Sequence, residues 1–101
     1  MSHEYYLVTL NAPPGLEDAL VDCLLTFENA HGFSSMSVNS RDCRNQNLSL
    51  AEQVSGRQRK IRFQMYVDKD NIAEFLARIK ADFSGAGLQY WVVPIIAYGE
   101  I

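Results

Sequence analysis

Histidine and cysteine are scarce in this sequence, which holds two of each among 101 residues. Cys23 and Cys43 form no CxxC pair and no paired Cys/His spacing, which argues against a zinc site and against a secreted disulfide framework. His3 lies near the N-terminus and His31 at the expected end of a helix, so no nucleophile, base and orienting group can be assembled around them. The sequence therefore predicts no catalytic residues and no enzyme.

Long hydrophobic runs are also missing. No apolar stretch approaches the ~20 residues that cross a bilayer, and the N-terminus lacks the basic region and apolar core of a signal peptide. The expected location is the cytoplasm. A chain of 101 residues is expected to form a single domain, residues 1–101, that buries enough surface to fold without a metal or a disulfide.

The first half of the chain shows a strand, a helix and a second strand. Residues 5–10 are rich in aromatic and β-forming side chains, and Pro13 and Pro14 follow them as a break. A helix is expected next, with Gly32 as its C-terminal stop, and a serine-rich strand over residues 33–40. The apolar face of that helix follows helical spacing: Leu16, Leu20, Cys23, Leu24 and Phe27.

The second half repeats the pattern in another order. Residues 61–67 alternate apolar and polar side chains, as a half-buried strand does, and Met36 and Met65 are both expected to pack. A helix over residues 72–83 and a last strand over residues 88–96 follow, with Pro94 placing that strand at a sheet edge. The α+β order predicts a ferredoxin-like βαββαβ fold: a four-stranded antiparallel sheet, two helices on one face, and a long loop between strands two and three.

The first and last strands are apolar on both faces, although the helices can cover only one. The uncovered face would then present an apolar patch of a size that usually marks an interface. This pattern predicts an oligomer that packs through the open face of the sheet. The alternating side chains are Tyr5, Leu7 and Thr9 against Tyr6, Val8 and Leu10, and Trp91, Val93 and Ile95 against Tyr90, Val92 and Ile96.

Positive charge is concentrated in one stretch of an acidic chain. Residues 41–62 hold six basic side chains and two acidic ones, whereas the rest holds three basic and ten acidic, which gives the net charge of -3. This balance favours an anionic partner for the loop, because arginine binds phosphate or carboxylate through two parallel donors, but a solvated hairpin is an equal alternative. The candidate ligand- or partner-binding residues of the loop are Arg41, Arg44, Arg57, Arg59 and Lys60.

Several functions of this topology require motifs that the sequence lacks. The third strand has no glycine and a single Tyr66 on its polar face, so it lacks the signature of an RNA-recognition module, and no nucleic acid is expected. No Cys-x-x-Cys follows the first strand, which excludes a copper-chaperone site. Cys43 lies between Arg41 and Arg44, which favours its thiolate and makes it the candidate metal ligand.

Nearly the whole chain resembles the PII-like superfamily, which includes the nitrogen regulatory protein PII and the cation-tolerance protein CutA. The resemblance is carried by the βαββαβ order, the long polar hairpin, the turn at residues 32–38 and the strand at residues 90–95. Residues 52–59 and the ending at residues 97–101 are closer still to a PII-like group found beside bacterial heavy-metal efflux pumps.

The resemblance implies a homotrimeric regulator with its sheets facing inward, ligands in clefts between subunits, and a loop that engages a partner such as a membrane transporter or efflux pump. The sequence also departs from PII in one respect. The glycines with which PII binds ATP are absent from residues 41–47, and the later Thr-Gly-Glu-Arg-Gly segment is reduced to Tyr98-Gly99-Glu100. Without them the backbone cannot approach phosphates in the same way, so no cofactor is expected and PII-type ATP binding is not predicted.

Two hypotheses result. The first is a trimeric PII-like regulator that senses a small anionic ligand or contacts a transporter, with a link to heavy-metal efflux. The alternative is a small metal-binding or metal-tolerance protein acting through Cys43 and neighbouring ligands.

Overall fold

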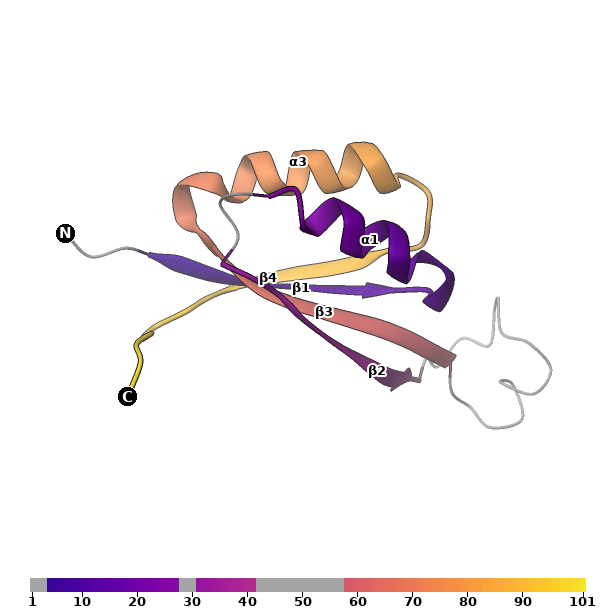
Figure 1. Cartoon of the computed structure of the whole chain (residues 1–101), viewed down its shortest axis with the longest axis horizontal. Coiled ribbons are helices and arrows are strands. Elements are labelled where there is room, and N and C mark those ends of the chain that lie inside the picture. The colour runs from indigo at the N-terminus through magenta and orange to yellow at the C-terminus, as the bar shows by residue number, and fades with distance from the viewer. Residues whose placement is uncertain (1–3, 28–30, 42–57) are drawn as a thin grey trace.

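Four strands form one antiparallel sheet in the order β2-β3-β1-β4, and two helices pack on one of its faces (Figure 1). The computed structural model describes residues 4–27, 31–41 and 58–101. This arrangement confirms the predicted α+β ferredoxin-like fold. In chain order the elements are β1 (Tyr5–Ala12), the 3-10 turn η1 (Pro14–Leu16), α1 (Glu17–Leu24), β2 (Ser34–Ser40), β3 (Gln58–Asp68), the 3-10 turn η2 (Lys69–Asn71), α3 (Ile72–Phe83) and β4 (Gln89–Pro94).

The core lies between the helices and the sheet. Successive side chains of each strand point to opposite faces, so every second one faces the helices. In β1 and β3, Val8 lies opposite Met65 and Leu10 opposite Phe63, and all four side chains are almost completely buried. Leu20 and Leu24 of α1 and Phe75 and Ile79 of α3 close the core from the helix side. The side chains between them in β1 and β3 face the other way, toward the open face of the sheet.

The first helix is shorter than its apolar spacing predicts. It ends at Leu24, and beyond it Thr26 and Phe27 donate to carbonyls only three residues back, at 3.1 and 3.2 Å. The Thr26 hydroxyl also donates to the Cys23 carbonyl at 2.6 Å, which offers the backbone an alternative to another helical turn. The prediction that Gly32 ends this helix is therefore wrong, although Phe27 still packs against the core.

The third strand begins earlier than its alternating pattern predicts. Gln58 and Arg59 already pair with Ser40 and Asn39 of β2, so the connection between the two strands covers residues 41–57. Arg59 and Lys60 are thus strand residues, and the prediction that they belong to the loop is wrong. Long polar side chains suit such a position, because β3 pairs there with β2 alone and β1 begins to pair with it only at Ile61. The predicted Ser49–Val54 turn lies outside the described residues.

β4 lies at one edge of the sheet, as Pro94 predicts, and the serine-rich β2 lies at the other edge. Pro94 is the last residue of β4, where its missing N–H costs no ladder hydrogen bond. Met65 is buried as expected, but Met36 is 44% exposed because it lies on the open face, opposite Arg62. Among the residues that the structure describes, no helix is both long and apolar enough to cross a bilayer.

Candidate functional site

Three of the predicted cationic residues lie at the base of the β2–β3 connection, where Arg59 and Lys60, as neighbours in β3, point to opposite faces of the sheet. Arg41 follows the last residue of β2, and Lys60 lies in β3 opposite Val38. Arg59, opposite Asn39, is exposed like Arg41, whereas Lys60 is half-buried. Arg44, Arg57 and Cys43 lie outside the described residues, so their predicted roles stay predictions.

A part-buried polar pair occupies the open face next to this base. Arg62, two residues after Lys60, donates its Nε–H to Asn11 Oδ1 at 2.9 Å, and its guanidinium lies 5.4 Å from the Trp91 ring centroid. Asn11 is 4% exposed, so this bond supplies a partner that water cannot. The neighbouring pair has the same form at longer range, since Gln64 donates to the Thr9 hydroxyl at 3.4 Å.

Apolar side chains border these polar pairs on the open face. Trp91 and Val93 of β4 are 41% and 42% exposed and Met36 of β2 is 44% exposed, while Leu7 of β1, opposite Val93, is half-buried. The face is therefore mixed, with apolar side chains around an ordered polar centre, and less uniformly apolar than the sequence pattern predicts. An uncovered face of this composition is typical of an interface with a polar and an apolar part.

Four aromatic rings gather at the opposite end of the open face. His31 stacks on Tyr66 with centroids 4.8 Å apart and planes within 7°, and its Nε2 lies 3.1 Å from Asp68 Oδ1. Tyr5 meets both rings edge-on, at 5.4 and 5.5 Å. Tyr98, from the segment after β4, lies 4.8 Å from Tyr66. His31 was expected at the end of a helix. It is instead part of an aromatic cluster.

The hydroxyls of Tyr66 and Tyr98 join the C-terminal segment to the sheet. Their oxygens are 2.8 Å apart. This hydrogen bond is the largest cause that raises the pKa of Tyr66 from 10.0 to about 12, and partial desolvation of the hydroxyl is the second. Either hydroxyl can be the donor, and the pKa of Tyr66 is raised where Tyr66 donates, because the bond then favours its protonated form. The segment after β4 is further fixed by Ile95, whose N–H donates to the Tyr5 carbonyl at 3.0 Å.

Cys23 is a packing residue of α1 rather than a reactive thiol. Burial raises the pKa of the Cys23 thiol, and the negative charge of Asp82, whose Oδ2 lies 3.8 Å from the sulfur, adds to the effect. Since the thiolate is the nucleophile and the metal ligand, this environment favours the inert form. Within residues 4–27, 31–41 and 58–101, no three His, Cys, Asp or Glu side chains are grouped as a metal ion would require.

Sequence reasoning did not find the aromatic cluster or the Arg62–Asn11 pair. Tyr66 stands out in the sequence only as an isolated ring on a polar face, and Tyr98 as part of a short ending. The register brings them together, because Leu7 pairs with Tyr66 on one side and with Val93 on the other. A prediction of the strand register, not of the strands alone, would have been the useful signal.

Comparison with known proteins gives a family and a fold. The profile of a family described as proteins of unknown function, DUF3240, matches residues 1–101. A DUF3240 family protein from Shewanella baltica superposes with a TM-score of 0.79 at 22% identity, over 100% of this chain and 99% of its own. Comparison with curated proteins gave no match.

Two further structures share the fold at lower identity. A protein from Thermus thermophilus described as PII-like and signalling has a TM-score of 0.65 at 20% identity, over 94% of this chain and 91% of its own. The divalent cation tolerance protein CutA from Archaeoglobus fulgidus has a TM-score of 0.71 at 13% identity, over 95% and 88%. The predicted resemblance to the PII-like superfamily is confirmed at the level of fold.

Proposed function

This chain belongs to the DUF3240 family, and from that premise we propose that it is a PII-like regulatory protein that self-associates through its open sheet face and binds an anion at the base of its β2–β3 connection. The observation that carries the proposal is the position of Arg41, Arg59 and Lys60. They lie where two strands enter that connection, in a fold shared with PII-like proteins. The proposed assembly is a homotrimer, and a membrane transporter or efflux pump is its proposed protein partner.

Self-association is supported by the composition of the open face. Trp91 and Val93 leave about two-fifths of their surface in water, and both lie on the side of the sheet that neither α1 nor α3 covers (Figure 1). Aromatic side chains and arginines are enriched in interfaces, and Arg62 beside Trp91 supplies one of each. Burial of this face against copies of the same chain would remove the exposed apolar surface from water.

Anion binding is supported by the charge at the loop base. Arg41 and Lys60 approach the same connection from opposite ends, and residues 41–62 carry a positive balance within an acidic chain. Arginine and lysine together suit phosphate and carboxylate groups, arginine through its planar donors and lysine as a compact charge. A ligand bound there could alter the connection and, with it, the surface offered to a partner.

A stability screen tests the anion site. Nucleotides, cyclic dinucleotides, small carboxylates and bicarbonate would be added to the wild type, and thermal unfolding measured. An anion that binds only the folded state at a hundredfold excess over its dissociation constant should stabilise it by about 2.7 kcal/mol. The double variant Arg41→Gln/Lys60→Gln should lose at least about tenfold in affinity, which is ~1.4 kcal/mol of binding free energy.

The matched control is Lys69→Gln/Arg78→Gln, which also removes one lysine and one arginine, from η2 and α3. It should keep the wild-type affinity. The anion-binding proposal fails if no anion stabilises the wild type, or if the two double variants bind alike. The metal-binding alternative depends on Cys43, and unchanged copper, silver and zinc binding in Cys43→Ser would remove it.

A further inference from the structure

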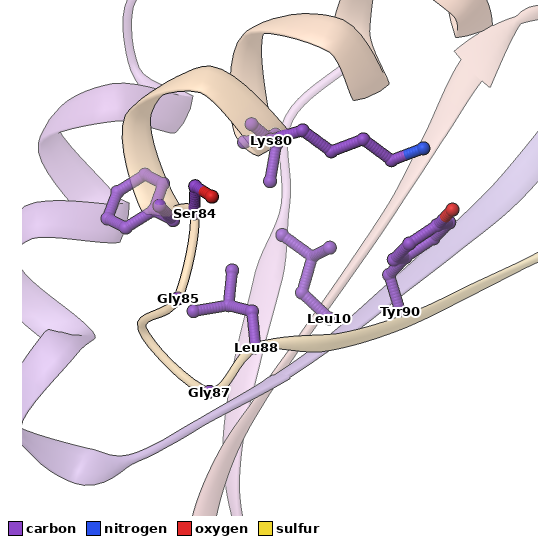
Figure 2. Close-up of a pocket in the computed structure, with 9 residues that line it drawn as sticks. Leu10, Lys80, Ser84, Gly85, Gly87, Leu88 and Tyr90 are labelled. Carbon is purple, nitrogen blue, oxygen red and sulfur yellow. The ribbon is translucent and has the colours of Figure 1, made fainter.

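A cavity lies between the C-terminal end of α3, the turn over residues 84–88 and the start of β4 (Figure 2). Its volume of about 460 Å³ falls within the range of pockets that hold small organic molecules. Leu10 and Ile79 close its inner end, and they are 0% and 5% exposed. The cavity is therefore open to solvent on one side and closed by the core on the other.

The walls of the cavity are apolar. Phe83, the last residue of α3, and Leu88, the residue before β4, both line it, and both pack partly against the core. Together with Leu10 and Ile79 they form an apolar surface. Water inside the cavity would find few hydrogen-bond partners on it. An apolar ligand body of matching size would remove that surface from water.

Two glycines in the turn over residues 84–88 line the cavity. Gly85 has φ 75° and Gly87 has φ 86°, a left-handed backbone that disfavours other residues. A Cβ on Gly85 would meet no atom within 4 Å, whereas one on Gly87 would lie 3.6 Å from Pro13 Cγ, so it is the backbone conformation rather than crowding that favours glycine at both positions. Ala86 between them holds the turn, since its N–H donates to the Phe83 carbonyl at 3.1 Å.

The polar rim carries a single positive charge. Lys80 extends along the rim toward Tyr90, and its ammonium lies 5.1 Å from the Tyr90 ring centroid (Figure 2). No carboxylate is among the lining residues, although acidic side chains outnumber basic ones in the chain by twelve to nine. Asp82, the nearest acid along α3, is directed instead toward Cys23 and toward Arg78, whose Nε lies 3.9 Å from its Oδ2.

We propose that this cavity binds a small organic acid with an apolar body, its hydrocarbon part against Leu10 and Leu88 and its carboxylate at the Lys80 ammonium. One lysine matches one negative charge. Lys80 lies in the last turn of α3, where the final carbonyls form the negative end of the helix dipole, so its ammonium is the group that would hold the carboxylate against that dipole. The same dipole and the lack of a second base disfavour a polyphosphate.

This site goes beyond the proposed function and does not depend on it. None of the lining residues belongs to the cationic base formed by Arg41, Arg59 and Lys60, and none lies on the open face of the sheet. The two proposals can therefore fail separately. The double variant Arg41→Gln/Lys60→Gln should bind the acid as the wild type does.

The test is a nuclear magnetic resonance titration of the full chain with octanoate, and with octanamide as its uncharged counterpart. Octanoate should shift the backbone amides of residues 84–88 saturably. Lys80→Gln should weaken octanoate binding about tenfold, as expected for loss of a charged partner, while Arg78→Gln, on the same helix but outside the cavity, should not. Octanamide should bind wild type about as weakly as octanoate binds Lys80→Gln.

Three results would overturn the proposal: no saturable shifts at residues 84–88, equal octanoate affinity in Lys80→Gln and Arg78→Gln, or equal affinity of the wild type for octanoate and octanamide. Lys80 and Arg78 are both exposed, and the Arg78 guanidinium lies over the Phe27 ring at 4.7 Å, outside the cavity. The dispersion of the amide spectrum reports directly that each variant is folded.

Discussion

The Tyr98 hydroxyl sets the titration of Tyr66 in the aromatic cluster of Tyr5, His31, Tyr66 and Tyr98. It is 2.8 Å from the Tyr66 hydroxyl, and the resulting bond raises the pKa of Tyr66 to about 12. A group whose pKa is higher in the folded state binds its proton more tightly there. Its contribution to stability is present below pH 10 and is lost as the pH rises toward 12.

Tyr98→Phe should lower the pKa of Tyr66 toward its usual value while keeping the packed ring. The pH dependence of the Tyr66 Cζ chemical shift measures this pKa directly. Stability between pH 10 and 12 should then fall less steeply in the variant than in the wild type. Tyr90→Phe is the control, because Tyr90 lies over the cavity beside Lys80. An unchanged Tyr66 titration in Tyr98→Phe would show that the hydroxyl contact is not its cause.

At the scale of elements, the two helices show what sequence periodicity predicts and what it misses. The spacing of Ile72, Phe75 and Ile79 predicts α3 with the bounds that the structure gives it, because its apolar face and its polar turns agree. The first helix has an equally regular face but ends at Leu24, where Thr26 bonds back to Cys23. That local competition does not appear in hydrophobic periodicity.

Phe75→Ala tests the contribution of α3 to the core. Phe75 is 2% exposed and its ring lies 4.6 Å from that of Phe27, so truncation leaves a cavity that neighbouring side chains cannot fill. The expected loss in the free energy of unfolding is about 3–5 kcal/mol, measured by urea denaturation at one protein concentration. Glu74→Ala, the exposed neighbour, should cost under about 0.5 kcal/mol. Similar unfolding midpoints for the two variants would contradict this packing.

At the scale of the whole molecule, the fold could be predicted because the order of strands and helices along the chain follows from local sequence patterns. The candidate sites could not, since they depend on register. Asn11 meets Arg62 and Tyr66 meets Tyr98 only once β1, β3 and β4 are aligned. The cationic loop base was predicted in part: the charge was visible, but Arg59 and Lys60 extend β3 rather than the loop.

The open sheet face carries the central claim, because a PII-like regulator of this form is proposed to act as an oligomer. Val93→Lys places a charge on that face, at a side chain that is 42% exposed and pairs with Leu7. Leu25→Lys introduces the same change just after α1, at a side chain that is 70% exposed. Burial of an unpaired lysine in an interface is costly, whereas an exposed lysine is not.

The decisive measurement is the mass in solution by light scattering at micromolar concentration. The account predicts three times the 11.4 kDa of one chain for the wild type and for Leu25→Lys, and a mass close to that of one chain for Val93→Lys. A single-chain mass for the wild type, or an unchanged trimer in Val93→Lys, would contradict self-association through the open face.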